Sequence, residues 1–286
     1  MVMNTIGSWR AGACGAALAV AVLCGAGALS SVAHAQDESP QARGETVQSL
    51  DPRVAKQLLA AYEKLEAENF KGALADPIVV DPQLVGQSNR NAVRPGDMKP
   101  FDRASVYQIR GQAHVNVDRV DLALNDFKAA LAENALPAEA SLQLRYNVAQ
   151  LQFQQENYKE AIRGLTEWMR ATDNPGANAW FLLAAAYYYE NDFKNARVPA
   201  ERALQLSESR ERRQFDLANM IYSELGLADK RTRLLSIMVS LWPDELSYWK
   251  QLAALYMQEE RSKDALSTLE LAYNSGLIKE PSDILS

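Results

Sequence analysis

The apolar positions between residues 180 and 203 predict two short helices joined by a polar turn. The first helix carries apolar residues at i, i+3, i+4 and i+7, on one face: Trp180, Leu183, Ala184 and Tyr187. Asn191 and Asp192 interrupt this pattern and can cap a new helix. The second helix then carries a narrow face of mostly small residues: Phe193, Ala196, Ala200 and Ala203. Such a face lets two helices approach closely.

This spacing matches the tetratricopeptide repeat signature W-x2-L-G-x2-Y followed by small residues, with Ala184 in place of the glycine. The small residue of the second helix recurs at the following positions, with an arginine in one degenerate copy: Ala123, Ala161, Ala196, Arg231 and Ala265. The separations are 38, 35, 35 and 34 residues (161−123, 196−161, 231−196 and 265−231). The expected period is about 34 residues. Prolines mark several repeat ends: Pro137, Pro175, Pro243 and Pro281. An irregular helical bundle is the alternative, and five agreeing registers argue against it.

We therefore expect an all-α fold, an α-solenoid (right-handed superhelix) of tetratricopeptide repeats with one continuous core. Residues 104–286 form five repeats, the last ending without a full capping helix. Residues 50–76 form a divergent N-terminal helix pair, and residues 77–103 form a Pro/Gly-rich excursion. Pro199 should bend the helix that contains it. At the end, either Ile284 and Leu285 pack on the last repeat or the chain is a truncated member of a longer family.

Residues 1–35 have the pattern of a secretory signal peptide. Arg10 is their only charge, an Ala/Val/Leu/Gly run follows, and Ala33 and Ala35 form an A-x-A cleavage site before Gln36. We expect cleavage after Ala35 and export to the periplasm, with an uncleaved membrane anchor as the alternative. Residues 36–49 are polar and predict a disordered lead-in.

Cleavage changes the composition in ways that exclude several function classes. Cys14, Cys24 and His34 leave with the signal, so His114 is the only histidine that remains. The net charge becomes −7, from 29 Lys+Arg (30 minus Arg10) and 36 Asp+Glu. An acidic helical protein is a poor candidate for binding nucleic acid or anionic lipid.

The residues offer no catalytic or metal constellation. Hydrolytic triads need a base beside the nucleophile, and His114 occupies a packing position of the repeat, which favours a core histidine. Zinc sites need Cys/His/carboxylate clusters, and no phosphate-binding Gly-rich loop follows a strand. We expect no enzyme, no metal and no cofactor; a cell-wall hydrolase is a remote alternative.

Four segments resemble a family of bacterial periplasmic tetratricopeptide proteins associated with TonB energy-transduction systems. They are residues 99–104 (KPFDRA), 144–151 (LRYNVAQL), 248–253 (YWKQLA) and 269–273 (LELAY) with Gly276 and Leu277. The resemblance spans residues 50–285. Members start with a signal peptide and usually continue through further repeats, whereas this chain ends early. The resemblance implies an interaction scaffold working beside TonB, ExbB and ExbD, and it names no catalytic residue.

The first helix of each repeat lines the concave surface in the tetratricopeptide family that this chain resembles. The side chains predicted there are amides and aromatics without charge: Tyr146, Gln150, Phe153, Gln154, Asn178, Phe181, Tyr188 and Tyr189. Amides can pair with the backbone of an extended peptide while rings cover its apolar side chains. The alternative for Tyr188 and Tyr189 is packing against adjacent helices. We expect a protein or peptide partner of the cell envelope; an assembly factor or chaperone for exported or outer-membrane proteins is the second hypothesis.

Overall fold

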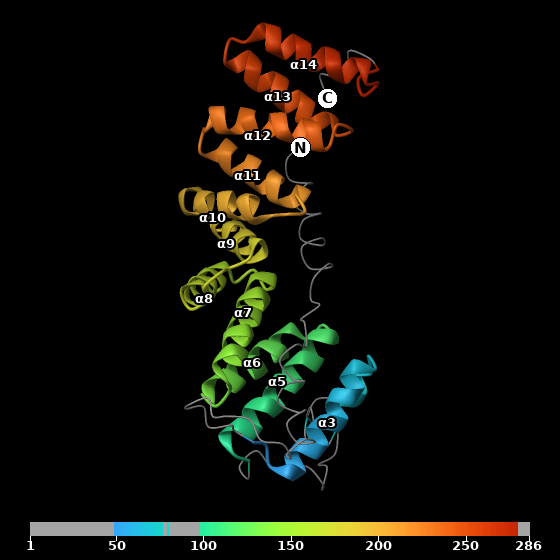
Figure 1. Ribbon diagram of the computed structural model, residues 1–286, viewed down its shortest axis with the longest axis vertical. Helices are drawn as coiled ribbons and strands as arrows, with labels where there is room; N and C mark the ends of the chain where they lie inside the picture. The colour runs from blue at the N-terminus through green and yellow to red at the C-terminus, as the bar shows by residue number, and fades with distance from the viewer. Residues whose placement is uncertain (1–48, 77–78, 80–97, 280–286) are drawn as a thin grey trace, which may run out of the picture. The chain divides into compact units, whose positions relative to one another are not determined.

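The computed structural model describes residues 49–76, 79 and 98–279. Within these ranges the chain forms twelve α-helices, α3 to α14, and no strand; all of them except the short α4 are labelled in Figure 1. The all-α prediction is confirmed. The expected signal segment, the lead-in up to residue 48, most of the excursion and residues 280–286 lie outside the described residues.

The chain divides into two compact units, Met1–Thr172 and Asp173–Ser286, where the sequence predicts one continuous core. The division falls between α8 and α9, in a turn that contains Pro175 and Gly176. Unit 1 contains α3 (Pro52–Glu66), α4 (Phe70–Leu74), α5 (Pro100–Asn116), α6 (Val120–Ala132), α7 (Ala138–Gln154) and α8 (Tyr158–Arg170). Unit 2 contains α9 (Ala177–Tyr189), α10 (Phe193–Leu206), α11 (Arg212–Glu224), α12 (Ala228–Leu241), α13 (Leu246–Gln258) and α14 (Ser262–Asn274).

The turn between the two helices of every described pair contains one residue with left-handed backbone. These residues are Glu68, Asp118, Glu156, Asn191, Gly226 and Glu260, with φ between 56° and 64°. Two backbone hydrogen bonds close each turn; in one, Glu156 N–H donates to the carbonyl of Phe153 and Asn157 N–H to that of Gln152. This is the Schellman arrangement that satisfies carbonyls at a helix end.

The same turn identifies the N-terminal pair as a further copy of the repeat. Each left-handed residue lies five positions before the small residue of the second helix, and Glu68 lies five positions before Ala73. Ala73 is fully buried, as are Ala123, Ala161 and Ala196. Residues 52–74 therefore have the geometry of a repeat whose second helix is only five residues long.

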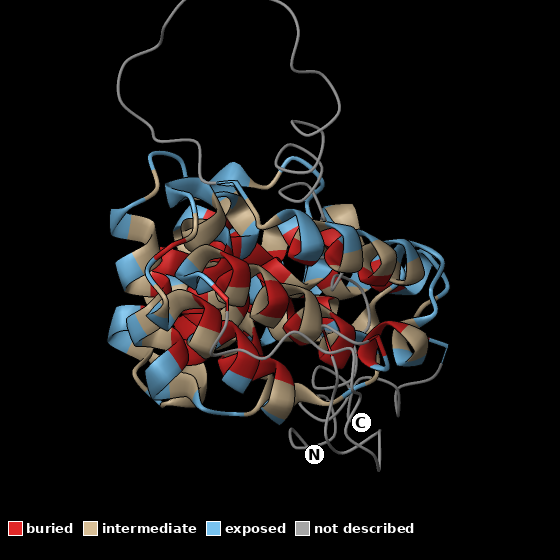
Figure 2. Ribbon diagram, turned by 90° about the horizontal axis from the view of Figure 1, so that it is seen from below, coloured by how far each residue is buried: buried red, intermediate tan, exposed pale blue. Residues whose placement is uncertain are grey.

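Small residues let the two helices of a pair approach closely. A Cβ atom added to Gly111 of α5 would lie 2.4 Å from the Phe127 ring of α6, which no real contact allows. The helix α10 continues through Pro199, which is buried. In Figure 2, buried and exposed stretches alternate along the helices, as expected for amphipathic elements that each cover a neighbour.

The degenerate repeat accommodates Arg231 with amides. Arg231 Nε donates to Asn219 Oδ1 at 2.9 Å, and Arg231 Nη2 donates to Gln251 Oε1 at 2.9 Å. Asn219 Nδ2 also donates to Gln251 Oε1, at 3.0 Å. Burial lowers the pKa of the Arg231 guanidinium. Arg231 can occupy the position that is alanine in the other repeats because its guanidinium is hydrogen-bonded to Asn219 of α11 and Gln251 of α13.

The helix α5 begins at Pro100, four residues before the predicted start at Ala104. The buried Asp102 carboxylate explains the earlier start. Its Oδ2 accepts from Lys99 N–H at 3.3 Å, and its Oδ1 accepts from Asp51 N–H at 3.1 Å. Asp102 therefore caps α5 and also holds the residue before α3, so one side chain joins the first two pairs.

Candidate functional site: the faces of the first helices

The predicted partner-binding residues all lie on first helices, four on α7 in unit 1 and four on α9 in unit 2. We call the surfaces that carry these residues and their equivalents, on α7 in unit 1 and on α9, α11 and α13 in unit 2, the first-helix face. The two halves are described separately.

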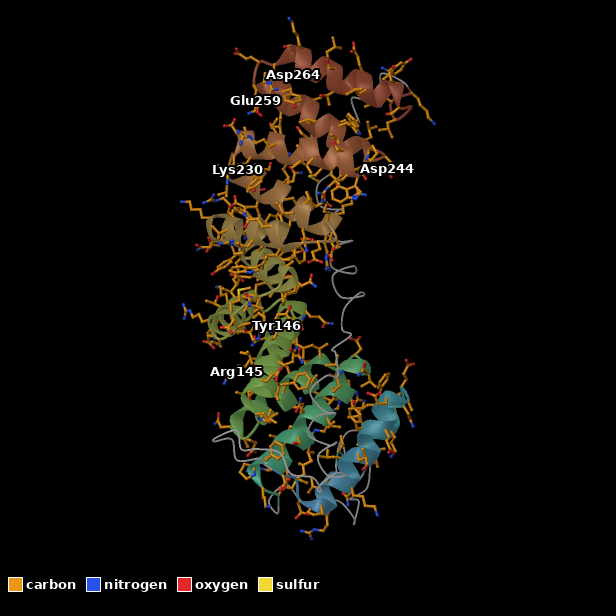
Figure 3. The ribbon with its side chains drawn as sticks, in the orientation of Figure 1. Arg145, Tyr146, Lys230, Asp244, Glu259 and Asp264 are labelled. Atoms are coloured by element: carbon orange, nitrogen blue, oxygen red, sulfur yellow. The ribbon has the colours of Figure 1, made fainter. Side chains whose placement is uncertain are left out.

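The α7 half combines packed rings with half-exposed amides. The Tyr146 ring, labelled in Figure 3, lies 4.6 Å from the Trp168 ring of α8 between centroids. Burial raises the pKa of the Tyr146 hydroxyl. The Phe153 ring meets Tyr158 edge-on at 5.3 Å. Both rings are therefore held against the second helix of their own pair.

The amides of Gln150 and Gln154 are available to a partner. Both side chains are half-buried, and neither makes a side-chain hydrogen bond within the described part of the chain. They lie one helical turn apart on α7: Gln150 lies between Tyr146 and Phe153 in sequence, and Gln154 directly follows Phe153. An amide supplies both a donor and an acceptor, which matches the two polar groups of a peptide unit.

The α9 half begins with a stacked arginine. The Arg213 guanidinium of α11 lies 5.1 Å above the Phe181 ring, and Arg213 Nη2 donates to Asn178 Oδ1 at 3.4 Å. Phe181 is only 7% exposed, so a partner would reach Arg213 and Asn178 before this ring. Arg213 Nε also donates to Glu211 Oε2 at 2.6 Å.

Tyr188 joins three helices of unit 2. Its ring lies 5.4 Å from Phe193 of α10 and 5.9 Å from Tyr189, and its hydroxyl donates to Met220 Sδ of α11 at 3.7 Å. Burial, then the nearby Glu224 carboxylate, raises the pKa of this hydroxyl. Tyr188 and Tyr189 remain half-buried. The tyrosines thus pack on neighbouring helices while keeping part of their surface open.

A polar network between α11 and α13 was not predicted as a site. Arg212 Nε donates to the Tyr248 hydroxyl at 2.8 Å, and that hydroxyl donates to Asp216 Oδ1 at 2.5 Å. Arg212 Nη2 also pairs with Glu245 Oε2. One feature of the sequence could have indicated this network. Tyr248 directly precedes the packing residue Trp249, and the equivalent residue of the preceding repeat is Gln214, which is also polar and buried.

The network shifts the pKa values of its two carboxyls in opposite directions. Burial raises the pKa of Asp216 above its ordinary value, although the Tyr248 hydrogen bond opposes this. Burial is also the largest single effect at Glu245, but the hydrogen bonds from Arg212 and Ser247, together with the Arg212 charge, outweigh it and lower the pKa. The pKa of Tyr248 is raised by burial and by its hydrogen bond to Asp216.

His114 lies in the core, as predicted. It is 2% exposed, and its Nε2 lies 3.6 Å from Asp126 Oδ2, a carboxylate that also accepts from Arg110 Nε at 2.9 Å. Among the described residues there is no cluster of His, Cys, Asp and Glu suited to a metal ion. The helices described here also include none that is long and apolar enough to cross a membrane.

Comparison with solved structures shows the tetratricopeptide fold. YrrB, described as a TPR protein with an unusual peptide-binding site, is similar with a TM-score of 0.51 and 18% identity, over 64% of this chain and 90% of its own. MamA is similar with a TM-score of 0.51 and 16% identity, over 60% of this chain and 91% of its own. No protein-family model and no curated protein matches the sequence. The fold is an α-solenoid of tetratricopeptide helix pairs.

Proposed function

We propose that this protein is an interaction scaffold that binds an extended segment of a protein partner along its first-helix face. The observation that carries the proposal is the pair of half-exposed amides, Gln150 and Gln154, without side-chain hydrogen bonds in the described residues. The Tyr146 and Phe153 rings lie on the same helix, held by α8 and Tyr158, and Phe153 directly precedes Gln154. The preorganised rings lose little side-chain entropy on binding, and the two amides offer donors and acceptors to the backbone of an extended peptide.

Peptide binding by a similar fold supports this reading. YrrB has a peptide-binding site according to its description. In unit 2, Arg213 and Asn178 extend the polar character of the face beside the partly open Tyr188 and Tyr189. The recognition would thus use hydrogen bonds for the peptide backbone and aromatic surface for its apolar side chains.

The location and the partner class follow from the sequence. The signal pattern with its Ala33/Ala35 cleavage site favours a periplasmic protein that begins at Gln36. The resemblance of residues 50–285 to TonB-associated scaffolds favours an envelope partner such as TonB, ExbB or ExbD. An assembly factor for exported or outer-membrane proteins is the second candidate, favoured by the uncharged amides and rings among the predicted residues of α7.

Site-specific photocrosslinking tests these proposals together. A photoreactive phenylalanine analogue at Gln154 should crosslink to an envelope protein in the periplasm, identified by mass spectrometry. The matched control carries the same analogue at Glu167, an exposed residue of α8, and should form no such crosslink. The intact mass of the purified protein should correspond to a start at Gln36.

The identity of the crosslinked protein separates the two candidates. TonB, ExbB or ExbD would support the energy-transduction role, and many outer-membrane proteins in transit would support the assembly role. Crosslinks that form from Glu167 and not from Gln154 would contradict binding at the first-helix face. A protein that retains Met1 in the membrane fraction would contradict cleavage after Ala35.

A further inference from the structure

The last described helix of unit 2 carries an apolar stripe with an exposed residue at each end and the half-buried Leu269 between them. Leu266, Leu269 and Tyr273 of α14 fall at i, i+3 and i+7, on one face. Leu266 is 59% exposed and Tyr273 is 62% exposed. The helix packs on α13, and its buried residues, Ala265, Thr268 and Ala272, lie on a different face. No described helix follows α14, which begins near the labelled Asp264 in Figure 3.

In the preceding pair the equivalent face is covered. The residues 34 positions earlier are Thr232, Leu235 and Val239 of α12, and all three are buried. The helix α12 packs against α13, the first helix of the next pair. The stripe on α14 therefore continues a helix-to-helix interface that is already used inside the array.

Two charges beside the stripe indicate what covers it. Lys263 and Glu270 are exposed, and neither forms an ion pair with another described residue. They lie two turns apart on the same flank, with the lysine nearer the start of α14. A second α14 packed antiparallel would place the lysine of each copy near the glutamate of the other. A two-fold interface requires such self-complementarity.

We propose that two copies of this protein associate through α14, with Leu266 beside the two-fold axis, Leu269 and Tyr273 extending the apolar contact outward, and the Lys263–Glu270 pairs at the rim. The stripe lies on a second helix and shares no residue with the first-helix face. A single helix pair is a small interface, so the dissociation constant should be on the order of micromolar.

Sedimentation analysis of the chain from Gln36, which keeps every described residue, tests the proposal. It should show a concentration-dependent monomer–dimer equilibrium. Leu266→Glu should raise the dissociation constant at least about tenfold, because it places a charge in the apolar stripe. Leu271→Glu is the matched control: Leu271 is also 59% exposed but lies about 140° around the helix, so association should be unchanged.

A charge swap identifies the occupant as a second copy. Lys263→Glu should weaken association by juxtaposing like charges, and the combination of Lys263→Glu with Glu270→Lys should restore it. A chain that stays monomeric up to about 100 μM, well above the expected constant, would overturn the proposal. So would a swap that fails to restore association. A monomeric protein whose melting temperature falls with Leu266→Glu would show that its own chain covers the stripe.

Discussion

Asp216 and Glu245 show how one network gives two carboxyls opposite energetic roles. Both lie near Arg212, but Asp216 is also buried against the Tyr248 hydroxyl. Burial dominates at Asp216 and raises its pKa, whereas the Arg212 hydrogen bond lowers the pKa of Glu245. The protein therefore disfavours one charge and favours the other within a single contact between α11 and α13.

This difference predicts opposite pH dependences for two variants. The pKa of Asp216 is higher in the folded protein than its ordinary value of 3.8. The free energy of unfolding therefore falls as the pH rises from 3.8 through the folded-state pKa. Asp216→Asn should therefore gain stability relative to wild type between about pH 3 and pH 7. A lowered folded pKa has the opposite sign, so Glu245→Gln should be less stable than wild type at pH 7 and approach it as the pH falls.

Urea unfolding of the three proteins at both pH values measures these differences. Two variants whose stabilities change in parallel with pH would contradict the network described here.

For single residues, the sequence predicted which helix carries a side chain better than which side chains it contacts. The spacing placed Tyr146, Phe181 and Tyr188 on first helices, and they lie there. The side chains that contact these three rings lie on other helices: Trp168, Arg213 and Phe193. The periodicity of one helix cannot predict contacts with another helix. The same holds for Arg231, which departs from the repeat pattern. Its guanidinium donates hydrogen bonds to Asn219 and Gln251 on two other helices.

At the scale of elements, the turns repeat more regularly than the helices. Each pair uses a left-handed residue, and only one of the six is glycine, Gly226. The sequence showed polar breaks at these places but not their backbone geometry, because non-glycine residues rarely adopt it. Helix existence was predictable from apolar spacing, whereas the start of α5 at Pro100 depended on Asp102 and a partner far away in sequence.

The turn geometry predicts two substitutions of opposite effect. Gly226→Ala should lower the free energy of unfolding by about 1–2 kcal/mol, because a side chain there is strained by its φ of 64° although space is open. Glu260→Gly should raise it by about 1 kcal/mol, because glycine relieves the same strain.

Glu260→Ala is the control, because it removes the carboxylate but keeps the strain, and it should bring no such gain. Chemical denaturation of the three variants gives these values. A destabilised Glu260→Gly protein would show that the left-handed turn is not under strain.

At the scale of the whole molecule, the all-helical solenoid fold was predictable and the division into two compact units was not. The repeat period placed the helix pairs from residue 104 onward, and the fold is the expected tetratricopeptide solenoid. The boundary at Thr172 lies in a turn that the sequence showed only as another repeat end with Pro175. Periodicity describes each repeat alone, so it carries no information on which neighbours form one compact unit.

The central claim is that a partner binds the first-helix face, and hydrogen exchange tests it most directly. The chain from Gln36 would be compared with and without the partner captured from Gln154. We expect amide exchange to slow at least about tenfold in α7 and to slow also in α9 or α11, while exchange in the second helices α8 and α10 stays unchanged. Protection confined to α8, α10 or α14 would contradict it.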